Sequence, residues 1–462
     1  MKSKIVYICS NCKFQQAKWT GRCPNCNNWN TFDEEEVLKK PQTTSNSKNS
    51  LGAKKAQKLS EIKVFNSDRI ITDLKEFNRV VGGGIVKDSI SILTAKPGAG
   101  KSTLLLQVAH DISKKGYKVL YASGEESESQ IKNRADRIFK NSEYENIWIY
   151  SHMSLNNVLE VVKEVDPDFI IIDSIQTFIL EEYSSRPGSP IQTMECANEL
   201  LRLAKDVKRP RAVIIVGQMT KEDELAGVRS LEHLVDCVLM IEGDSLEELR
   251  SLVCSKNRFG STGEVGFFSM TEKGMVSIDN PSQFFMTNRE LDDKVYGSAL
   301  SVLKEGNRCI IVEIESLVSN SMAPYPSRIS DCLKKDQLNT LLSILEERGK
   351  IKLFDKNVVI KATGGIRLKE QCVNLAVIIS IVSSFKNKPI DNRCVFIGDV
   401  GLTGEIKRVP SLELRLKEVD RMGFLKAYVP KGENYNNLKF KNLTLKPVKY
   451  LHEVIEDVFN SK

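Results

Sequence analysis

One glycine-rich segment constrains the fold of this chain more than any other feature. It follows a short apolar stretch, Ser89–Thr94, and leads into an amphipathic helical pattern that starts at Ser102. Its residues are Ala95, Lys96, Pro97, Gly98, Ala99, Gly100, Lys101, Ser102 and Thr103. A strand, a glycine-rich loop ending in Gly-Lys-Ser and a helix, in this order, are typical of a phosphate-binding loop, because the N–H groups at a helix N-terminus attract anions. The sequence therefore predicts that these nine residues bind a nucleotide, ATP.

Two positions of this loop have predicted roles beyond the backbone cradle, and one departs from the usual pattern. We expect Lys101 to reach the β- and γ-phosphates and Ser102 to ligate Mg²⁺. A second Mg²⁺ ligand is expected at the end of a neighbouring strand, where Asp173 follows the apolar run Phe169–Ile172. Ala95 stands where such loops usually have their first glycine, which matters if that position needs a positive φ.

Hydrolysis also needs a carboxylate that orients water. Glu125 and Glu126 follow the predicted strand Lys118–Ala122, and we favour Glu125 as the general base, with Glu126 as the alternative. Gln218 follows the apolar run Ala212–Val216, where a γ-phosphate sensor belongs; a plain polar loop residue is the competing interpretation.

Apolar runs alternate with amphipathic stretches along most of the chain, which predicts α/β architecture with a mainly parallel sheet. The expected strands are Ser89–Thr94, Lys118–Ala122, Ile147–Tyr150, Phe169–Ile172, Ala212–Val216 and Cys237–Ile241. The expected helices are Ser102–Lys114, Glu128–Phe139, Ser154–Glu164 and Gln192–Lys208. After about Phe285 the pattern becomes less regular, with a long apolar helix expected at Gln371–Ser384, so a second domain is expected over residues 286–462.

Four cysteines near the N-terminus form two Cys-x-x-Cys pairs: Cys9, Cys12, Cys23 and Cys26. Two such turns supply the four thiolates of a tetrahedral structural Zn²⁺ site, so residues 1–32 are predicted to be a zinc ribbon. Aromatic and basic side chains among them, such as Trp19, Trp29 and Arg22, either stack on single-stranded nucleic acid or simply cover the metal core.

Between Val37 and Ser60 there are six lysines and no acidic residue, among small polar residues, and we expect a flexible basic linker over residues 33–58. The net charge of +7 permits an anionic partner without requiring one. No apolar stretch is long enough to cross a membrane, and no secretory signal is evident at Met1–Ile5, so a cytoplasmic location is expected.

The segment Lys256-Asn257-Arg258-Phe259-Gly260 completes a resemblance that covers nearly the whole chain. With the four-cysteine ribbon, the phosphate loop, Ala122–Ser127 and Ile170–Thr177, it resembles the bacterial RadA/Sms family of recombination proteins. The resemblance implies a RecA-like ATPase core over residues 59–285, a hexameric ring, binding of single-stranded and branched DNA, and ATP-driven branch migration or unwinding alongside the RecA recombinase. It also implies that Lys256 and Arg258 reach DNA or a neighbouring subunit's nucleotide; without it, this segment is only a basic turn.

Residues 286–462 resemble the Lon protease domain, whose peptidases use a serine and a lysine. In an ungapped alignment Cys372 falls at the nucleophile position and Glu413 at the lysine position. We therefore expect a non-proteolytic scaffold with a core cysteine. Three classes of function follow: a DNA-translocating ATPase, which we favour, an ATP-dependent peptidase and a nucleotide-controlled switch without motor activity.

Overall fold

The structure is a computed structural model of the chain. It describes residues 69–140, 144–218, 229–243, 248–290, 293–432, 435 and 438–460, and, in the N-terminal part, residues 4–9, 15, 16, 19, 21, 22, 24, 26, 28, 29, 32–37 and 58. The chain divides into two compact units, residues 1–65 and residues 66–462. Among the described residues, no helix is long and apolar enough to cross a membrane.

The N-terminal unit contains a small antiparallel sheet with the strand order β2-β1-β3. Its strands are β1 (Lys4–Cys9), β2 (Gln15–Gln16) and β3 (Phe32–Val37). Strand β3 pairs with β1 over its whole length, from Cys9↔Phe32 to Lys4↔Val37. The expected linker boundary at residue 33 is therefore too early, because residues 33–37 belong to the sheet. Most of the rest of the expected linker lies outside the described residues.

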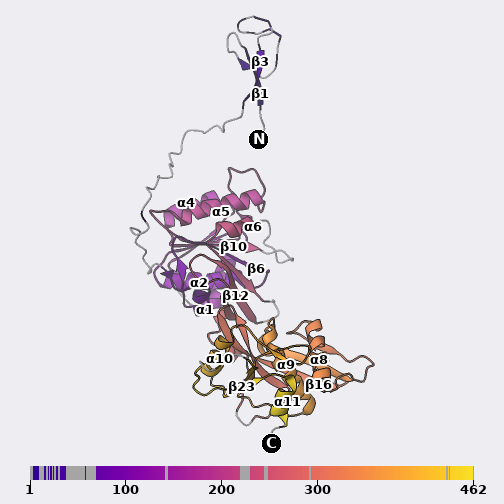
Figure 1. The fold of residues 1–462 in the computed structure, drawn as a ribbon. Coiled ribbons are helices and arrows are strands. Elements are labelled where there is room, and N and C mark those ends of the chain that lie inside the picture. Colours follow the sequence, from indigo (N-terminus) through magenta and orange to yellow (C-terminus); the bar gives the residue numbers. More distant parts are fainter. Residues whose placement is uncertain are drawn as a thin grey trace. The chain divides into compact units, whose positions relative to one another are not determined.

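The first part of the second unit is built on a nine-stranded sheet with the order β14-β13-β12-β11-β6-β10-β9-β7-β8 (Figure 1). The strands are β6 (Ile90–Ala95), β7 (Val119–Ser123), β8 (Ile147–Ser151), β9 (Phe169–Asp173), β10 (Ala212–Gln218), β11 (Cys237–Glu242), β12 (Leu249–Asn257), β13 (Val265–Thr271) and β14 (Gly274–Ser277). Strands β6 to β11 pair in parallel, which confirms the predicted α/β class. Strands β12, β13 and β14 extend the sheet in antiparallel fashion and were not expected.

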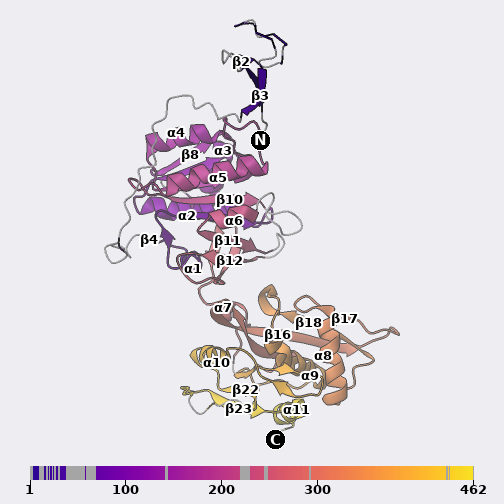
Figure 2. The same cartoon turned by 45° about the horizontal axis from the view of Figure 1, so that its top comes forward.

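Helices cover both faces of this sheet, as the strand–helix alternation predicts (Figure 2). The helices are α1 (Lys75–Val80), α2 (Lys101–Lys114), α3 (Glu128–Phe139), α4 (Leu155–Val165), α5 (Pro190–Ala204) and α6 (Arg229–Leu234). One core cluster joins α1, α2 and α3 to one face, and another joins α4, α5 and α6 to the opposite face. A short hairpin of β4 (Arg69–Ile70) and β5 (Ile85–Val86) flanks α1. Burial on both faces explains why the parallel strands are apolar throughout.

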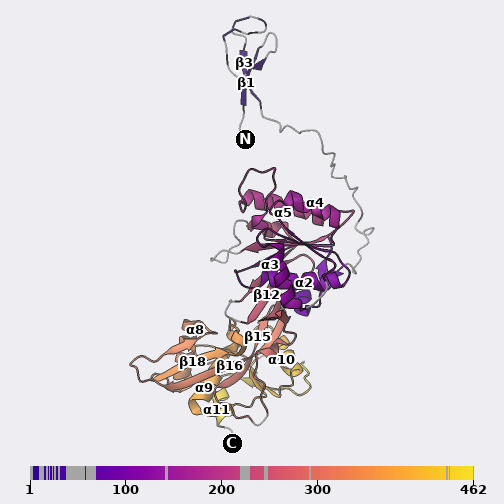
Figure 3. The ribbon, with the colours of Figure 1, turned by 180° about the vertical axis from the view of Figure 1, so that it is seen from behind.

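A second, seven-stranded mixed sheet, with the order β17-β18-β16-β15-β19-β22-β23, organises the C-terminal part (Figure 3). Its strands are β15 (Ser298–Glu305), β16 (Arg308–Asn320), β17 (Arg328–Ser330), β18 (Lys356–Ala362), β19 (Cys394–Phe396), β22 (Lys426–Pro430) and β23 (Thr444–Val448). The remaining elements are the helices α7 (Pro281–Phe284), α8 (Lys335–Arg348), α9 (Asn374–Lys386), α10 (Leu412–Arg421) and α11 (Leu451–Phe459) and the short hairpin β20 (Asp399–Val400) with β21 (Ile406–Lys407). The expected apolar helix is the buried α9, preceded by a single 3₁₀ turn, Gln371–Val373.

The two sheets share packing and charge contacts near the expected boundary at residue 285. Phe267 of β13 packs edge-to-face on Phe285, with ring centroids 5.6 Å apart. The buried carboxylate of Glu76 accepts hydrogen bonds from the Phe267 N–H at 3.0 Å and from Arg308 at 2.9 Å. The domain boundary at 285/286 stays a prediction, since no break in packing marks it.

Candidate functional site

The phosphate loop connects β6 to α2, as the sequence predicts. Gly98 and Gly100 have φ values of 77° and 104°, so the two glycines occupy backbone conformations that other residues rarely adopt. Ala95 ends β6 as a fully buried strand residue, and it is not among the residues with positive φ. The alanine at this position therefore costs no backbone strain. The Lys101 ammonium donates to the Ala95 carbonyl at 3.1 Å, which folds the lysine back over the loop.

Ser102 and Asp173 come together at the carboxyl edge of the sheet. The Ser102 hydroxyl donates to Oδ2 of Asp173 at 2.9 Å, and the Tyr121 phenol donates to the same oxygen at 2.6 Å. Asp173 is 7% exposed, and its burial raises the pKa of the carboxyl, which these two hydrogen bonds partly oppose. A hydroxyl and a carboxylate at this separation are the oxygen ligands that Mg²⁺ takes beside nucleotide phosphates, so this pair fits the expected metal.

The charge of Lys101 belongs to the same group of residues. Burial lowers the pKa of its ammonium, while the charges of Asp173 and Glu125 raise it. The ammonium of Lys101 can pair with the phosphates of a nucleotide, and the Mg²⁺ bound to that nucleotide would offset the charge of the two carboxylates.

Glu125, which lies just beyond β7, is next to Gln218, the last residue of β10. Oε1 of Glu125 accepts a hydrogen bond from Nε2 of Gln218 at 2.6 Å, and a second from the Ser174 hydroxyl. Glu126 points elsewhere, because Arg134 of α3 holds both of its oxygens, at 2.6 and 2.7 Å. Glu125 is thus the glutamate that Arg134 does not hold, and its role as the general base stays a prediction.

Two of the four predicted zinc ligands, Cys9 and Cys26, lie among the described residues of the N-terminal unit. Sγ of Cys9 lies 3.7 Å from Sγ of Cys26. This is too long for a disulfide, and it is close to the ~3.8 Å expected for two thiolates on one tetrahedral Zn²⁺ with Zn–S bonds of ~2.3 Å. Cys12 and Cys23 lie outside the described residues. The Cys9–Cys26 pair therefore fits a zinc site.

Comparison with known proteins identifies the family of this chain. Its relatives include three bacterial proteins that are each named "DNA repair protein RadA". The one from Bacillus subtilis is 40% identical over 431 residues, which cover 93% of both chains. The one from Listeria monocytogenes is 39% identical over 94% of both chains, and the one from Campylobacter jejuni is 40% identical over 93% of this chain and 94% of the relative. The chain belongs to the RadA family of DNA repair proteins.

Family models assign two parts of this RadA family member. Residues 56–224 match an AAA domain, and residues 7–34 match a rubredoxin metal-binding domain. The first match spans the phosphate loop, Asp173 and Gln218, and the second spans all four cysteines. The chain is thus an ATP-binding protein of the ATPase class with a zinc-binding ribbon. The solved structure of another ATPase domain aligns with 45% of this chain and 90% of its own at 16% identity, with a TM-score of 0.38.

The segment Lys256–Gly260 lies at the amino-terminal ends of the parallel strands, the opposite edge of the sheet from the phosphate loop. Strand β12 runs antiparallel to β11, so Asn257 pairs with Cys237, whereas Ala95 aligns with Ile241 at the other end of β11. Lys256 donates to the carbonyls of Glu232 and His233, at 2.6 and 3.2 Å. Arg258 pairs with the buried Asp236 at 3.0 Å. The structure therefore does not bring Lys256 and Arg258 to the nucleotide site of their own chain.

In the C-terminal part of this RadA family member, Cys372 is a core cysteine. It is 3% exposed, and burial raises the pKa of its thiol to about 12. The residue beside it is Arg415, whose Nη1 lies 3.2 Å from the sulfur, and not Glu413. Glu413 pairs with Lys417 at 2.7 Å on the exposed side of α10, so the alignment that placed it at the base position is wrong. Arg415 is bound to Glu370 at 2.8 and 2.9 Å, and a guanidinium held by a carboxylate cannot take a proton.

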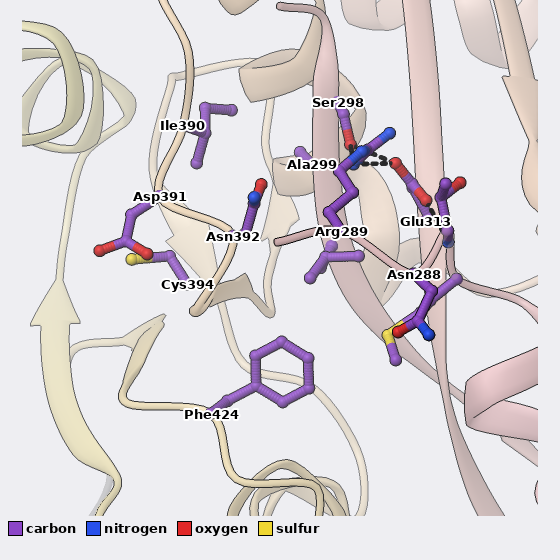
Figure 4. Close-up of a pocket in the computed structure, with 13 residues that line it drawn as sticks. Asn288, Arg289, Ser298, Ala299, Glu313, Ile390, Asp391, Asn392, Cys394 and Phe424 are labelled. Atoms are coloured by element: carbon purple, nitrogen blue, oxygen red, sulfur yellow. Dashed lines mark hydrogen bonds and ion pairs between the residues drawn. The ribbon is translucent and has the colours of Figure 1, made fainter. Parts of the chain in front are cut away.

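A cavity of about 160 Å³ also lies in the C-terminal part (Figure 4). Its lining residues are Met286, Thr287, Asn288, Arg289, Ser298, Ala299, Leu300, Glu313, Ile390, Asp391, Asn392, Cys394 and Phe424. None of them is a predicted site residue. The buried Glu313 accepts from Ser298 at 2.6 Å and from the Thr287 N–H at 2.7 Å, and it pairs with Arg289, so the charges of this wall neutralise each other.

Sequence reasoning missed Tyr121, Arg134 and Ser174, which hold the predicted residues in place. Tyr121 sits inside an apolar strand, where nothing in the sequence separates a polar role from a packing role. Ser174 directly follows Asp173, and that adjacency was the only available signal.

Proposed function

We propose that this RadA family protein is a DNA-dependent ATPase of DNA repair and homologous recombination. It binds single-stranded and branched DNA in the cytoplasm, drives branch migration or unwinding of recombination intermediates alongside RecA, and acts as a hexameric ring. The observation that carries the proposal is the position of two sets of residues on one sheet. The nucleotide residues lie at one edge, and Lys256 and Arg258 lie at the other.

At the nucleotide edge, the loop amides between Lys96 and Ser102 hold the phosphates and Lys101 donates to their outer oxygens. Mg²⁺ bound by Ser102 and Asp173 would neutralise charge that develops on the phosphate oxygens. Glu125 takes a proton from the attacking water, and its hydrogen bonds with Gln218 and Ser174 fix the carboxylate in position. Gln218 also connects Glu125 to the end of β10, beside the phosphate loop on β6.

Lys256 and Arg258, at the opposite edge, couple ATP hydrolysis to movement on DNA. A cation that cannot reach its own nucleotide acts on DNA or on the nucleotide of the next subunit, and in a ring both kinds of contact change with each hydrolysis event. The C-terminal part is a non-proteolytic scaffold, because Cys372 is buried without a base. It exposes basic side chains that suit a phosphate backbone, namely Lys350, Lys352, Lys361, Arg367 and Lys369.

The test compares ATP hydrolysis with and without single-stranded DNA for the wild type, Lys101→Ala and Lys256→Ala, followed by a branch-migration assay. We expect DNA to stimulate the wild type, Lys101→Ala to be inactive, and Lys256→Ala to hydrolyse ATP without moving branches. Lys163→Ala is the matched control, because Lys163 is exposed on α4 and outside both edges. A wild-type ATPase that ignores DNA would support the nucleotide switch, and ATP-dependent casein cleavage would support the peptidase.

A further inference from the structure

Arg250 is a buried arginine behind the phosphate loop. It lies on β12 and is 2% exposed, one of the largest fully buried side chains among the described residues. Its Nε donates to the carbonyl oxygen of Ala99 at 3.1 Å, and its Nη1 donates to the Leu249 carbonyl at 2.9 Å. An arginine is expensive to bury, so a buried one must make contacts that compensate for its lost hydration.

The carbonyl that accepts from Arg250 belongs to the peptide between Ala99 and Gly100. Ala99 lies between Gly98 and Gly100 and is 3% exposed. In a planar trans peptide the C=O and the next N–H point in opposite directions. Holding the Ala99 oxygen on Arg250 therefore directs the Gly100 N–H away from β12. That N–H is one of the donors that a phosphate loop offers to its anion.

A rotated peptide would have the reverse effect. Turning this peptide over changes ψ of Ala99 and φ of Gly100, and the glycine, which has no Cβ, offers little steric resistance to that change. Turned over, it would present the partial negative charge of the Ala99 oxygen where the phosphates bind. The Arg250 hydrogen bond selects against that conformation, and the buried carbonyl would lose its partner if it turned.

Neighbouring contacts hold Arg250 and the loop in register. A Cβ on Gly243 would lie 2.7 Å from the Leu249 carbonyl oxygen and 2.8 Å from Cδ of Arg250, so the glycine leaves space for both. Met270 and Met275, from β13 and β14, pack on Gly100, where an added Cβ would collide with the Met270 side chain. Gln107 of α2 exchanges hydrogen bonds with the backbone of Met275, at 2.8 and 3.1 Å. The three antiparallel strands thus form a wall behind the loop.

We propose that Arg250 is a positioning residue for ATP binding, which holds the phosphate loop in its anion-binding conformation through the Ala99 carbonyl. It does not touch the nucleotide, so its effect is on the fraction of molecules whose loop is ready to bind. The apparent dissociation constant for ATP rises in inverse proportion to the fraction of molecules whose loop is ready, and the chemical step is unchanged.

Two substitutions separate the hydrogen bond from the space that the side chain fills. Arg250→Gln places an amide nitrogen where the arginine has Nε, so it keeps the donor. Arg250→Met introduces a side chain of the same length as glutamine without a donor. We expect Arg250→Met to raise the KM for ATP about tenfold with kcat changed by less than about threefold, and Arg250→Gln to stay within about threefold of the wild type in both.

The control is Arg415→Met, which removes an equally buried arginine far along the chain, in the C-terminal part. Hydrolysis is measured on the full chain with MgATP and without DNA, so that the result does not depend on the proposed DNA-driven function. Thermal unfolding of each variant is measured in parallel. An unchanged KM in Arg250→Met, the same KM rise in Arg415→Met, or a defect in Arg250→Gln as large as in Arg250→Met would overturn the proposal.

Gly243→Ala is a second route if Arg250→Met does not fold. At the φ of 139° of this glycine the added methyl strains the backbone, and it meets the Leu249 carbonyl oxygen as well as Cδ of Arg250. It therefore shifts the arginine together with the Leu249 carbonyl to which it donates, and we expect the KM for ATP to rise about threefold. A KM equal to that of the wild type in this variant would count against the proposal.

Discussion

The phenol of Tyr121 donates a 2.6 Å hydrogen bond to Oδ2 of Asp173, the oxygen that also accepts from Ser102. Tyr121 is 1% exposed, so its hydroxyl has no water as an alternative partner. The tyrosine thus fixes the carboxylate that is expected to hold Mg²⁺ beside the nucleotide.

Tyr121→Phe should weaken this arrangement without emptying the core. The loss of one hydrogen bond to a carboxylate should cost about 1–3 kcal/mol of unfolding free energy. Because this hydrogen bond lowers the pKa of Asp173, its removal should raise that pKa further, and the acid limb of the ATPase pH profile should move to higher pH. A Mg²⁺ titration of ATP hydrolysis at several pH values measures both effects. An unchanged Mg²⁺ requirement and an unchanged acid limb would show that Ser102 alone fixes Asp173.

The parallel part of the sheet could be predicted because its strands are buried on both faces. Runs such as Phe169–Ile172 are apolar at every position, and a polar residue directly after the run then marks the edge where ligands bind. Asp173 was predicted in this way, Glu125 from its position shortly after the strand Lys118–Ala122, and the phosphate loop from the spacing of its glycines and lysine.

The antiparallel strands β12 to β14 could not be predicted by the same reasoning. Buried and partly exposed residues alternate along β12, and one of its buried side chains is Arg250, a residue type that is expected at the surface. The partner of Cys372 was missed for a similar reason. An alignment without structure cannot show which face of α10 is turned inward, and Arg415 lies on that face, two residues beyond Glu413.

Removal of zinc should affect the N-terminal unit alone. Cys26→Ser removes one thiolate of the proposed site, and a ribbon this small depends on its metal for folding. We expect zinc content per chain, measured by atomic emission, to fall well below that of the wild type. ATP hydrolysis without DNA should stay within about twofold, since every nucleotide residue lies in the second unit. Loss of that basal hydrolysis would mean that the ribbon contributes to the nucleotide site.

His110 should make the protein sensitive to mild acid. It is 1% exposed on α2, and neither ring nitrogen has a hydrogen-bond partner within the described structure. Burial, followed by the charge of Lys114, lowers the pKa of the imidazole to about 4. Below pH 6.5, the ordinary pKa of an imidazole, His110 therefore binds a proton in the unfolded chain that it does not bind in the folded chain. Stability should fall as the pH drops from 6.5 towards 4, by up to about 3 kcal/mol.

His110→Phe removes this dependence while keeping a ring against Phe139, whose centroid lies 4.1 Å away. Urea unfolding at pH 7.5 and pH 5 measures the difference for both proteins. The free energy of unfolding of the variant should change less between the two pH values. An equal change in both proteins would assign the acid sensitivity to other groups.

Cys372 should be unreactive in the folded protein. Its burial and its pKa of about 12 leave almost no thiolate at neutral pH, and the thiolate is the form that reacts. Iodoacetamide at pH 8, followed by mass spectrometry of the peptide that contains it, should show modification only after denaturation. Rapid native labelling, abolished in Cys372→Ala, would contradict the core assignment and reopen the peptidase interpretation.

The two neighbouring glutamates provide the most direct test of the catalytic geometry. Oε1 of Glu125 accepts from Gln218 and Ser174, whereas both oxygens of Glu126 are held by Arg134. Glu125→Gln keeps the size of the side chain and removes its basicity, so kcat should fall by about 10²–10⁴ while ATP still binds.

Glu126→Gln is the matched control: it weakens the ion pair with Arg134, and it should lower stability by about 1–3 kcal/mol with kcat changed less than about fivefold. Single-turnover hydrolysis and binding of a fluorescent ATP analogue separate the two effects. If Glu126→Gln were the variant that lost kcat, the Arg134 pair would have to open during hydrolysis, and Glu126 would replace Glu125 as the base.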